Sequence, residues 1–375
     1  MHELRAEFPV LERLAYLNAG SNGPVPRRAA SAVEVELRAQ LEHGRGDPRY
    51  VSERALPRAE ELRHRVAALA GCEQGELALT GSTTDGVSTV LSALPLGPGD
   101  EVLTSDEEHP GVLVPLAAGR SRRGFSVRAV PLPALPGEIG PRTRLVACSH
   151  VSWVTGRVVD APALAEAGVP VLLDGAQGLG AVAVDVAELG CDFYAASGQK
   201  WLCGPNGVGY LYVRRELIGE LVPPWPGYGS IAAPEEALAL ASGDEPVDAG
   251  FREDAHRFDL GFPAPHHTGW ALAALDTLER DGLDALFDRA RSLAAGLAER
   301  LASRGLTVAP RGESTLVSWE VADPKAEAER LRSGGIVVRN IPGRPYVRAS
   351  VGAWNTEEEL ERLAAVAAPD ATSGS

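Results

Sequence analysis

The chain has 375 residues, of which 45% are hydrophobic and 23% charged, a composition typical of a globular protein with room for two packed domains. Its formal net charge of −15 disfavours nucleic acid and anionic membranes as partners, because both carry negative charge themselves. No apolar run reaches the roughly 18–20 residues that span a bilayer, and the charged N-terminus does not resemble a signal peptide, so we expect a cytoplasmic location. The four cysteines show no zinc-ligand spacing, and we expect neither a metal site nor a disulfide framework.

The predicted elements in the first two thirds of the chain alternate strands with helices. An apolar segment ending at Leu79 leads into a hydroxyl-rich turn and then a helix. Further strands are predicted at residues 101–104, 144–148, 169–173 and 208–213, with a short helix at 162–167. This alternation predicts an α/β domain with a mainly parallel sheet between helices. Ligands of such sheets bind beyond the carboxyl ends of the strands, so polar residues at those ends are the candidates for a site.

The pattern changes from about residue 269. A long helical pattern runs to Arg304, and Gly305 is expected to end it. Strands are predicted at 306–308, 315–319 and 336–338, a helix at 324–332, and a last helix from the capping sequence at 355–358.

These elements predict a smaller C-terminal α+β domain. We divide the chain into an N-terminal segment (1–15) that packs on the small domain, a large domain (16–260), the small domain (261–370) and a disordered tail (371–375).

The segment at 197–207 places one lysine, Lys200, in a loop rich in glycine and proline. Glycine lets the backbone approach a ligand closely. A lysine in a pocket can lose its proton and attack a carbonyl group to form a Schiff base. A solvated surface charge is the commoner role of a single lysine, so the loop alone leaves both interpretations open.

Asp174 directly follows the strand predicted at 169–173. A carboxylate there could keep a pyridine nitrogen protonated, so that the ring acts as an electron sink. The alternative is that Asp174 caps a following helix.

The turn at 80–86 could bind phosphate through the free N–H groups of a helix N-terminus, although an ordinary capped helix would look the same. His109 follows the strand at 101–104 and could stack on a planar cofactor or serve a structural role.

Two later segments add further candidates. The loop at 149–156 follows another strand and, taken alone, is a plain polar loop. Arg348 could bind a substrate carboxylate, with Arg339 and Arg344 as rivals.

In their order along the chain, from residues 16–23 to residues 348–359, these motifs resemble the class V aminotransferases. These are fold-type-I pyridoxal-phosphate (PLP) enzymes that include cysteine desulfurases, isopenicillin N epimerase and cystine C–S lyases. The resemblance implies a seven-stranded sheet in the large domain, pyridoxal 5'-phosphate as cofactor, and a homodimer with active sites at the subunit interface. It also implies that Lys200 is the Schiff-base lysine, that Asp174 contacts the pyridine nitrogen and that His109 stacks on the ring.

The resemblance implies roles for further residues. Thr83, Thr84 and Ser197 would hold the phosphate, Gln177 would bond the phenolic oxygen, and Arg348 would bind the substrate α-carboxylate. The other residues expected at the cofactor are Ser82 and Gln199, and those expected at the substrate are Asn18, Ala19, Gly20, Asn22 and Trp153.

Three departures from the family pattern bear on the reaction. Gln199 precedes the lysine where many relatives have histidine, and Trp153 stands where many have asparagine. The stretch at 333–345 contains no cysteine, whereas desulfurases use a nucleophilic cysteine there. We therefore predict β-elimination by a C–S lyase acting on cysteine, cystine or a cysteine conjugate, with transamination second and epimerisation third.

Two hypotheses from other classes compete with an enzyme. One is a catalytically silent binding protein that keeps the fold, which would need none of Lys200, Asp174, His109 and Arg348. The other is a nucleotide-binding protein that uses the turn at 80–86, but the chain lacks a Walker lysine and a dinucleotide glycine fingerprint.

Overall fold

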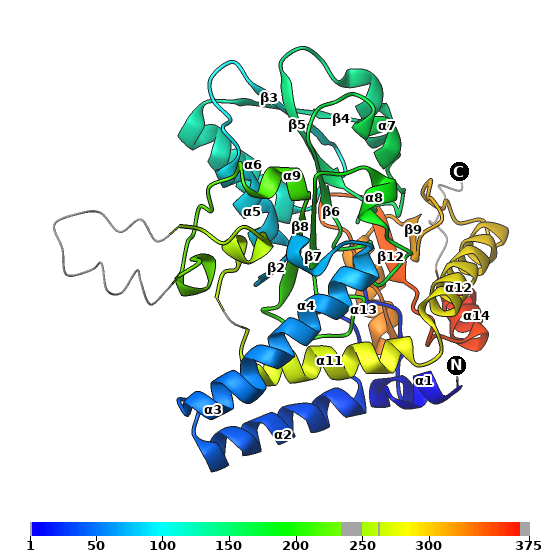
Figure 1. Ribbon diagram of the computed structural model, residues 1–375. Coiled ribbons are helices and arrows are strands. Elements are labelled where there is room, and N and C mark those ends of the chain that lie inside the picture. Colours follow the sequence, from blue (N-terminus) through cyan, green and yellow to red (C-terminus); the bar gives the residue numbers. More distant parts are fainter. Residues whose placement is uncertain (1, 234–249, 262, 368–375) are drawn as a thin grey trace.

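The computed structural model describes residues 2–233, 250–261 and 263–367, which form a large unit around a central sheet and a smaller unit beside it (Figure 1). The small unit contains the C-terminal helices and lies at one flank of the large unit. The predicted tail at 371–375 lies outside the described residues. Among the described helices, none is long and apolar enough to cross a membrane.

The central sheet has seven strands within the described residues, in the order β2-β8-β7-β6-β5-β3-β4. The first strand in this order, β2, and the two that follow it form antiparallel pairs, whereas the neighbours from β7 to β4 are parallel. This confirms the predicted fold class, a mainly parallel sheet between helices. The strands are β2 (Leu77–Thr80), β3 (Glu101–Ser105), β4 (Ser126–Val130), β5 (Thr143–Ser149), β6 (Val171–Asp174), β7 (Phe193–Ser197) and β8 (Gly209–Val213).

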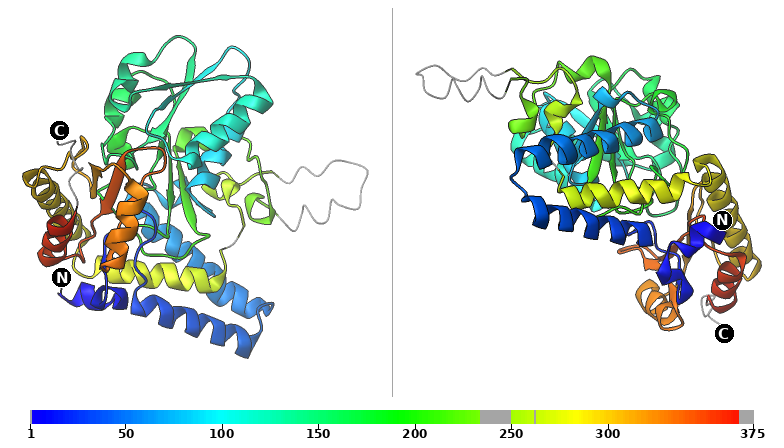
Figure 2. Two further views of the ribbon diagram at one scale, coloured as in Figure 1. Left: turned by 180° about the vertical axis from the view of Figure 1, so that it is seen from behind. Right: turned by 60° about the horizontal axis from the view of Figure 1, so that its bottom comes forward.

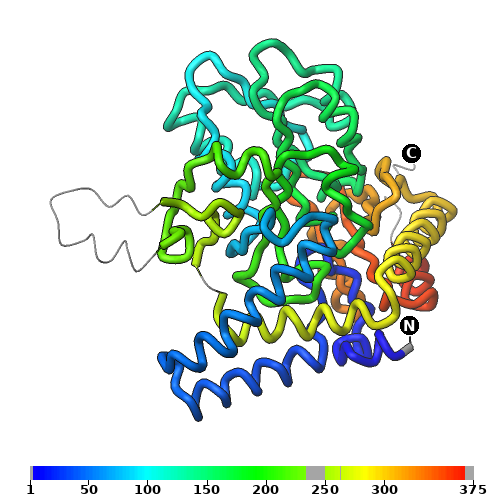
Figure 3. The backbone as a smooth tube through the Cα atoms, viewed as in Figure 1, coloured from blue at the N-terminus to red at the C-terminus, as the bar shows by residue number. Residues whose placement is uncertain are grey.

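Helices cover both faces of the sheet, so its central strands are buried on both sides (Figure 2). Successive residues of a strand point to opposite faces, and in β5 Ala147 packs under α5 and α6 while Cys148 packs in the core beneath α4 and α11. Beyond α4 and α11, α2 forms an outer layer (Figure 3). The chain begins with α1 (His2–Ala6). The helices of the large unit are α2 (Arg27–His43), α3 (Pro48–Tyr50), α4 (Leu56–Ala70), α5 (Thr83–Ala93), α6 (Pro110–Arg123), α7 (Ala161–Ala165), α8 (Val186–Leu189), α9 (Arg215–Ile218) and α11 (Pro265–Glu279).

The small unit is an antiparallel sheet, in the order β11-β12-β9, packed against three helices. As predicted, Thr356 and Glu359 form a capping box at the start of the last helix. The elements are α12 (Leu283–Ser303), β9 (Leu316–Glu320), α13 (Pro324–Ser333), β10 (Ile336–Val337), β11 (Arg339–Asn340), β12 (Tyr346–Ser350) and α14 (Glu357–Val366).

The N-terminal segment joins the small unit. β1 (Ala15–Tyr16) pairs with β10 in parallel, and Asn18 forms a bridge with Ser350. Arg5 donates hydrogen bonds to the carbonyl of Trp354 and to the carboxylate of Glu359. The start of the chain therefore lies against its C-terminal strands.

Two expectations about the second region are wrong. The long helical pattern is broken into α11 and α12, because Gly282 adopts a φ of +85° that interrupts the helical path. The strand expected at 306–308 is reduced to an isolated bridge between Val308 and Trp319. α11 packs on α2 and α4, so it contacts the large unit, and the proposed domain boundary near residue 261 stays a prediction.

Candidate active site

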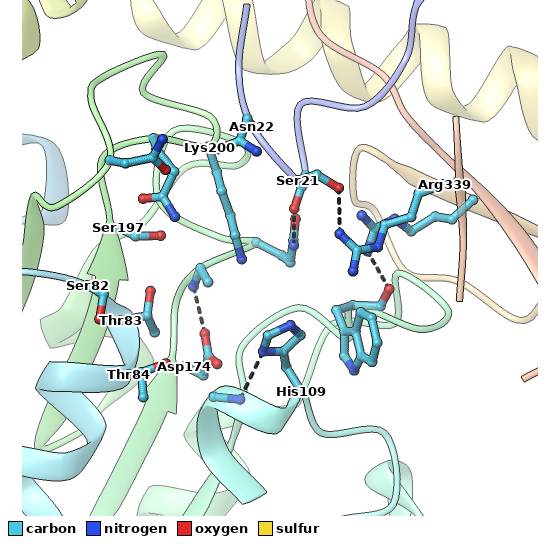
Figure 4. Close-up of a pocket in the computed structure, with 18 residues that line it drawn as sticks. Ser21, Asn22, Ser82, Thr83, Thr84, His109, Asp174, Ser197, Lys200 and Arg339 are labelled. Atoms are coloured by element: carbon cyan, nitrogen blue, oxygen red, sulfur yellow. Dashed lines mark hydrogen bonds between the residues drawn. The ribbon is translucent and has the colours of Figure 1, made fainter. Parts of the chain in front are cut away.

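A cavity of about 290 Å³ lies at the carboxyl ends of the parallel strands, where both units supply side chains (Figure 4). Of the residues predicted at the cofactor and substrate, all except Asn18 and Ala19 line it. Asn18 instead accepts a hydrogen bond from Ser21, and Ala19 is fully buried, so both support the wall from behind. Gly111, Ala176 and Asn206 also line the cavity and were not predicted, whereas Ser21 lies in the segment expected on the substrate side and Arg339 was considered as a rival of Arg348.

Lys200 reaches into the middle of this cavity from the loop after β7. The loop closes on itself through the N–H of Gly204, which donates to the carbonyl of Gly198 (2.8 Å). Gly23 packs against it so closely that a Cβ atom there would lie 2.2 Å from the Lys200 carbonyl oxygen. Enclosure by protein lowers the pKa of the Lys200 amine to about 8, although the nearby carboxylate of Asp174 acts in the opposite direction. The free amine is therefore roughly a tenth of Lys200 at pH 7, far more than for an ordinary lysine.

Asp174 ends β6 and is almost fully buried. Its Oδ1 atom accepts a hydrogen bond from the Ala176 N–H (2.9 Å). Burial raises the pKa of Asp174, whereas Lys200 and the Ala176 N–H oppose this shift. Turns follow it, and the next described helix, α8, begins only at Val186, so the interpretation of Asp174 as a helix cap is wrong.

One end of the cavity can hold an anion. Ser82 caps α5, accepting a hydrogen bond from the Asp85 N–H (3.1 Å), and the first turn of this helix faces the cavity. The hydroxyls of Thr83 and Ser197 are buried there without a hydrogen-bond partner in the described part of the chain. Buried hydroxyls rarely stay unpaired, and a helix N-terminus attracts negative charge. This end therefore suits a phosphate group.

His109 forms one side of the cavity at the start of α6. Its Nδ1 atom accepts a hydrogen bond from the Gly111 N–H (3.0 Å), which places the proton of the neutral ring on Nε2. Burial lowers the pKa of His109 to about 4, with Lys200 adding to the effect, so the ring is uncharged at neutral pH. The ring of Trp153 meets it edge-on, with 4.8 Å between the centroids.

Gln177 connects the cavity wall to the backbone at Gly20. Its amide nitrogen donates to the carbonyl of Gly20 (2.8 Å), and its oxygen accepts from the indole N–H of Trp201 (2.9 Å). One amide hydrogen of Gln177 is left for a ligand.

Arg339 stands at the end of the cavity opposite the anion site (Figure 4), and Arg348, its partner in the strand pairing, also lines the cavity. Arg348 is 1% exposed, and its Nη1 atom donates to the carbonyl of Trp153 (2.6 Å), while its Nε has no partner among residues with a described placement. Burial, helped by Arg339, lowers the pKa of Arg348 to about 9. Arg339 donates to Ser21 Oγ (3.0 Å) and lies 5.9 Å from the ring centroid of Trp153.

From the sequence, Arg339 was an alternative to Arg348 for binding the substrate carboxylate, but the structure places both in the cavity. They are direct partners in the β11–β12 pairing, so their side chains share one face of the sheet. No carboxylate forms an ion pair with either arginine within residues 2–233, 250–261 and 263–367. The described residues also contain no cluster of three or more His, Cys, Asp or Glu suited to a metal ion.

The chain is similar to known proteins over most of its length. The family model described as Aminotransferase class-V matches residues 16–363. An isopenicillin N epimerase from Amycolatopsis lactamdurans is 33% identical over 93% of each chain, and a cysteine desulfurase from Serratia proteamaculans (strain 568) is 31% identical over 97% of each.

The chain is also similar to solved structures of a cystine C–S lyase. The cystine C–S lyase C-DES, in complex with its reaction product cysteine persulfide, superposes with a TM-score of 0.87 at 28% identity, over 96% of this chain and 98% of that one. A variant of C-DES with glycine covalently linked to its PLP cofactor gives 0.88 at 28% identity over the same shares of the two chains.

Proposed function

The chain belongs to the class V aminotransferase family, and we propose that it is a C–S lyase that cleaves cystine or a cysteine conjugate by β-elimination. It is a PLP-dependent enzyme, as its family and its similarity to PLP-bound C-DES indicate. The observation that carries the proposal is the pair of arginines in the cavity. Arg339 and Arg348 both line it, and neither has a carboxylate partner among the described residues. The two carboxylates of a substrate such as cystine could each pair with one of these arginines.

The residues that line the cavity suit the cofactor in chemistry. The N-terminus of α5, with Ser82, Thr83 and Thr84, and the hydroxyl of Ser197 would bind the phosphate, which supplies the acceptor that the two unpaired hydroxyls need.

The rest of the cavity suits the cofactor ring. Asp174 would hold the proton of the pyridine nitrogen, His109 would cover the ring, and Gln177 would donate to the phenolic oxygen. Gln199, whose Oε1 is buried without a described partner, is a further candidate contact. Bound PLP supplies an electron sink for the electron pair left at the substrate α-carbon.

The proposed roles of the remaining groups follow from their places. Arg348 would bind the α-carboxylate and Arg339 a second anionic group on the leaving half of the substrate. The Lys200 amine, which would hold the cofactor covalently in the resting enzyme, would remove the α-proton once it is free. Loss of the β-sulfur with its bonding electrons breaks the C–S bond. For cystine, addition of water to the remaining fragment gives pyruvate and ammonia, with cysteine persulfide as the sulfur product.

Desulfurase chemistry is less well supported, because it needs a cysteine nucleophile at the substrate. None of the residues described around the cavity is a cysteine. Cys203 lies nearest in sequence to Lys200, but it is buried, and burial raises the pKa of its thiol well above the usual range. Transamination and epimerisation stay as alternatives, since an epimerase is among the most similar relatives.

A homodimer is part of this proposal. A second hollow adjoins the phosphate end, because Thr84 lines both, and it is bordered by Val114 and Trp225. Both side chains are more than half exposed, and a second copy of the chain would cover them. The cytoplasmic location expected from the sequence stays a prediction.

Replacement of Lys200 tests the enzyme proposal sharply, because Lys200 and Lys325 are the only lysines in the chain. We expect purified protein to be yellow, borohydride to fix the cofactor on the Lys200 peptide, and Lys200→Ala to lower turnover at least about a thousandfold. Lys325→Ala, on α13, is the matched control and should behave as the wild type. Fixation on Lys325, or a colourless protein that never takes up PLP, would contradict the proposal.

The reaction type needs a product assay with cystine, cysteine and S-substituted cysteines. Pyruvate and sulfur release without an amino acceptor supports the lyase. Strict dependence on a 2-oxo acid indicates a transaminase, and loss of optical activity without pyruvate indicates an epimerase.

A further inference from the structure

The loop at 152–156 connects the two units at the substrate end of the cavity. On the side of the small unit, the carbonyl of Val154 accepts a hydrogen bond from Ser318 Oγ (2.6 Å), and that of Gly156 accepts from Ser314 Oγ (2.7 Å). On the side of the large unit, the loop is held by the carboxylate of Glu107. This carboxylate precedes His109 in the chain but has no place in the mechanism given above.

Glu107 binds both hydroxyls that flank Trp153. Its Oε2 atom accepts hydrogen bonds from Ser152 Oγ and from Thr155 Oγ1, the latter at 2.6 Å. Ser152 Oγ also accepts from the N–H groups of Val154 and Thr155, at 3.1 Å each. Because backbone donors occupy the lone pairs of this hydroxyl, its own hydrogen is directed to Glu107.

The residue between these two anchors contacts three functional groups. The carbonyl of Trp153 accepts the hydrogen bond from Arg348 (2.6 Å), and its ring meets both His109 and Arg339. A shift of this loop would therefore move the acceptor that orients Arg348.

The adjacent carboxylate, Glu108, does not share this role. Its oxygens accept from Ser105 Oγ and from the N–H and Oγ of Ser149, at the ends of β3 and β5. Glu108 thus joins two strands of the large unit, whereas Glu107 reaches the loop that the small unit also holds.

We propose that Glu107 is a positioning residue for substrate recognition: by binding Ser152 and Thr155 it fixes Trp153, and through the carbonyl of Trp153 it fixes Arg348. This inference rests on the proposed function, in which Arg348 binds the α-carboxylate. Arg348 would hold that carboxylate equally in the bound substrate and in the transition state, so its displacement raises KM more than it lowers kcat. One oxygen of Glu107 accepts both hydroxyls, so glutamine, which keeps one carbonyl oxygen, can replace it.

The test compares Glu107→Ala, Glu107→Gln and the double variant Ser152→Ala/Thr155→Val, with Asp106→Ala as the matched control because Asp106 is the exposed neighbouring carboxylate. We expect Glu107→Ala and the double variant each to raise KM at least tenfold with kcat within threefold of the wild type and an unchanged cofactor absorption band. Glu107→Gln should return KM to within threefold, and Glu107→Ala placed in the double variant should add nothing. A fall in kcat as large as the rise in KM would overturn the proposal. So would a glutamine variant whose KM is raised as much as that of the alanine variant.

Hydrogen–deuterium exchange provides the second measurement. The N–H groups of Val154 and Thr155 should exchange at least tenfold faster in Glu107→Ala than in the wild type, and not in Asp106→Ala. This measurement needs neither cofactor nor turnover, so the two proposals fail differently. Unchanged exchange of these N–H groups in Glu107→Ala would overturn the positioning role of Glu107. A wild type that takes up no PLP would overturn the proposed function.

Discussion

The buried arginines of the active-site cavity and of the helical flank beside β2 differ in their carboxylate partners. At the flank, Arg63 of α4 is 1% exposed and forms a bidentate ion pair with Asp259, with N···O distances of 2.7 and 3.1 Å. Asp259 also accepts from the Leu79 N–H (2.8 Å). Arg348 in the cavity is equally buried but has no carboxylate partner in the described chain. A buried charge paired within the chain serves the fold, whereas an unpaired one is available for a ligand.

Breaking the pair at the flank should have the largest effect on stability. Asp259→Ala leaves the buried guanidinium of Arg63 with only the partly exposed Glu60, 3.3 Å away, as a carboxylate partner, so we expect the free energy of unfolding to fall by about 3 kcal/mol. Urea unfolding of the cofactor-free protein measures this. The matched control is Asp276→Ala, which removes an exposed partner of Arg65 and should cost less than about 1 kcal/mol. Equal effects of the two substitutions would show that burial does not matter here.

Replacing the buried arginine of the cavity should not lower the free energy of unfolding. Arg348→Met removes a buried charge that lacks a partner, so the cofactor-free protein should unfold at the same free energy or up to about 1 kcal/mol higher. Substrate binding should suffer, with KM rising about a hundredfold, since a charge-assisted contact to a carboxylate contributes roughly 2–3 kcal/mol. Arg63→Met, by contrast, should destabilise the fold. If Arg348→Met unfolds as easily as Arg63→Met, the distinction between the two regions is wrong.

A pH dependence of stability should arise at the flank. His256 Nε2 lies 3.1 Å from Glu60, and Nδ1 lies 3.0 Å from Asp254. Burial disfavours the charged ring, but the contacts with these carboxylates outweigh it and raise the pKa of His256 to about 9. Because this folded-state pKa exceeds the unfolded value of about 6.5, the stabilisation is complete below pH 6.5 and fades as the pH rises through 9.

Between pH 6.5 and 9.5 the wild type should therefore lose about 1–2 kcal/mol more than His256→Gln does. The exposed His43, changed to Gln, serves as the control and should follow the wild type. Parallel pH profiles for the wild type and His256→Gln would contradict the expectation.

The smallest expected effect concerns backbone strain beside Lys200. Cys203 is the one non-glycine residue in the described chain with a left-handed backbone, at φ +54°. Cys203→Gly and Cys203→Ala both remove the thiol, but only glycine relieves the strain, so the glycine variant should be more stable than the alanine variant by about 1 kcal/mol. Thermal unfolding compares them. An alanine variant equal to or more stable than the glycine variant would mean that this loop stores no strain.

The sequence was sufficient for the features that follow a local rule. Asp174 and His109 were candidates because they lie at or shortly beyond strand ends, and the carboxyl ends of parallel strands meet at one edge of a sheet. The glycines around Lys200 made it a candidate, and the order of the motifs along the chain made it the expected Schiff-base lysine. The break at Gly282 was missed, because glycine inside a helical pattern is often tolerated.

Features that depend on distant parts of the chain could not be read in this way. The sequence offered Arg339 and Arg348 as alternatives, and only the pairing of β11 with β12 places both in the cavity. The contacts of Glu107 join residues from two loops that no periodicity relates. Asn18 was expected at the substrate, but its contact with Ser21 turns it into a support of the wall.

The contact between the start and the end of the chain has a consequence for biosynthesis. The N–H of Leu17 donates to the carbonyl of Val337, and the N–H of Ser350 donates to the carbonyl of Leu17. On the ribosome, residues 15–18 emerge early but lack their strand partners until β10 and β12 have left the exit tunnel. The large sheet can fold while synthesis continues, because its strands end at Val213. The substrate end of the cavity is completed only after β12 has been synthesised, so a chain truncated before residue 336 would retain the cofactor-facing sheet without the groups that recognise a substrate.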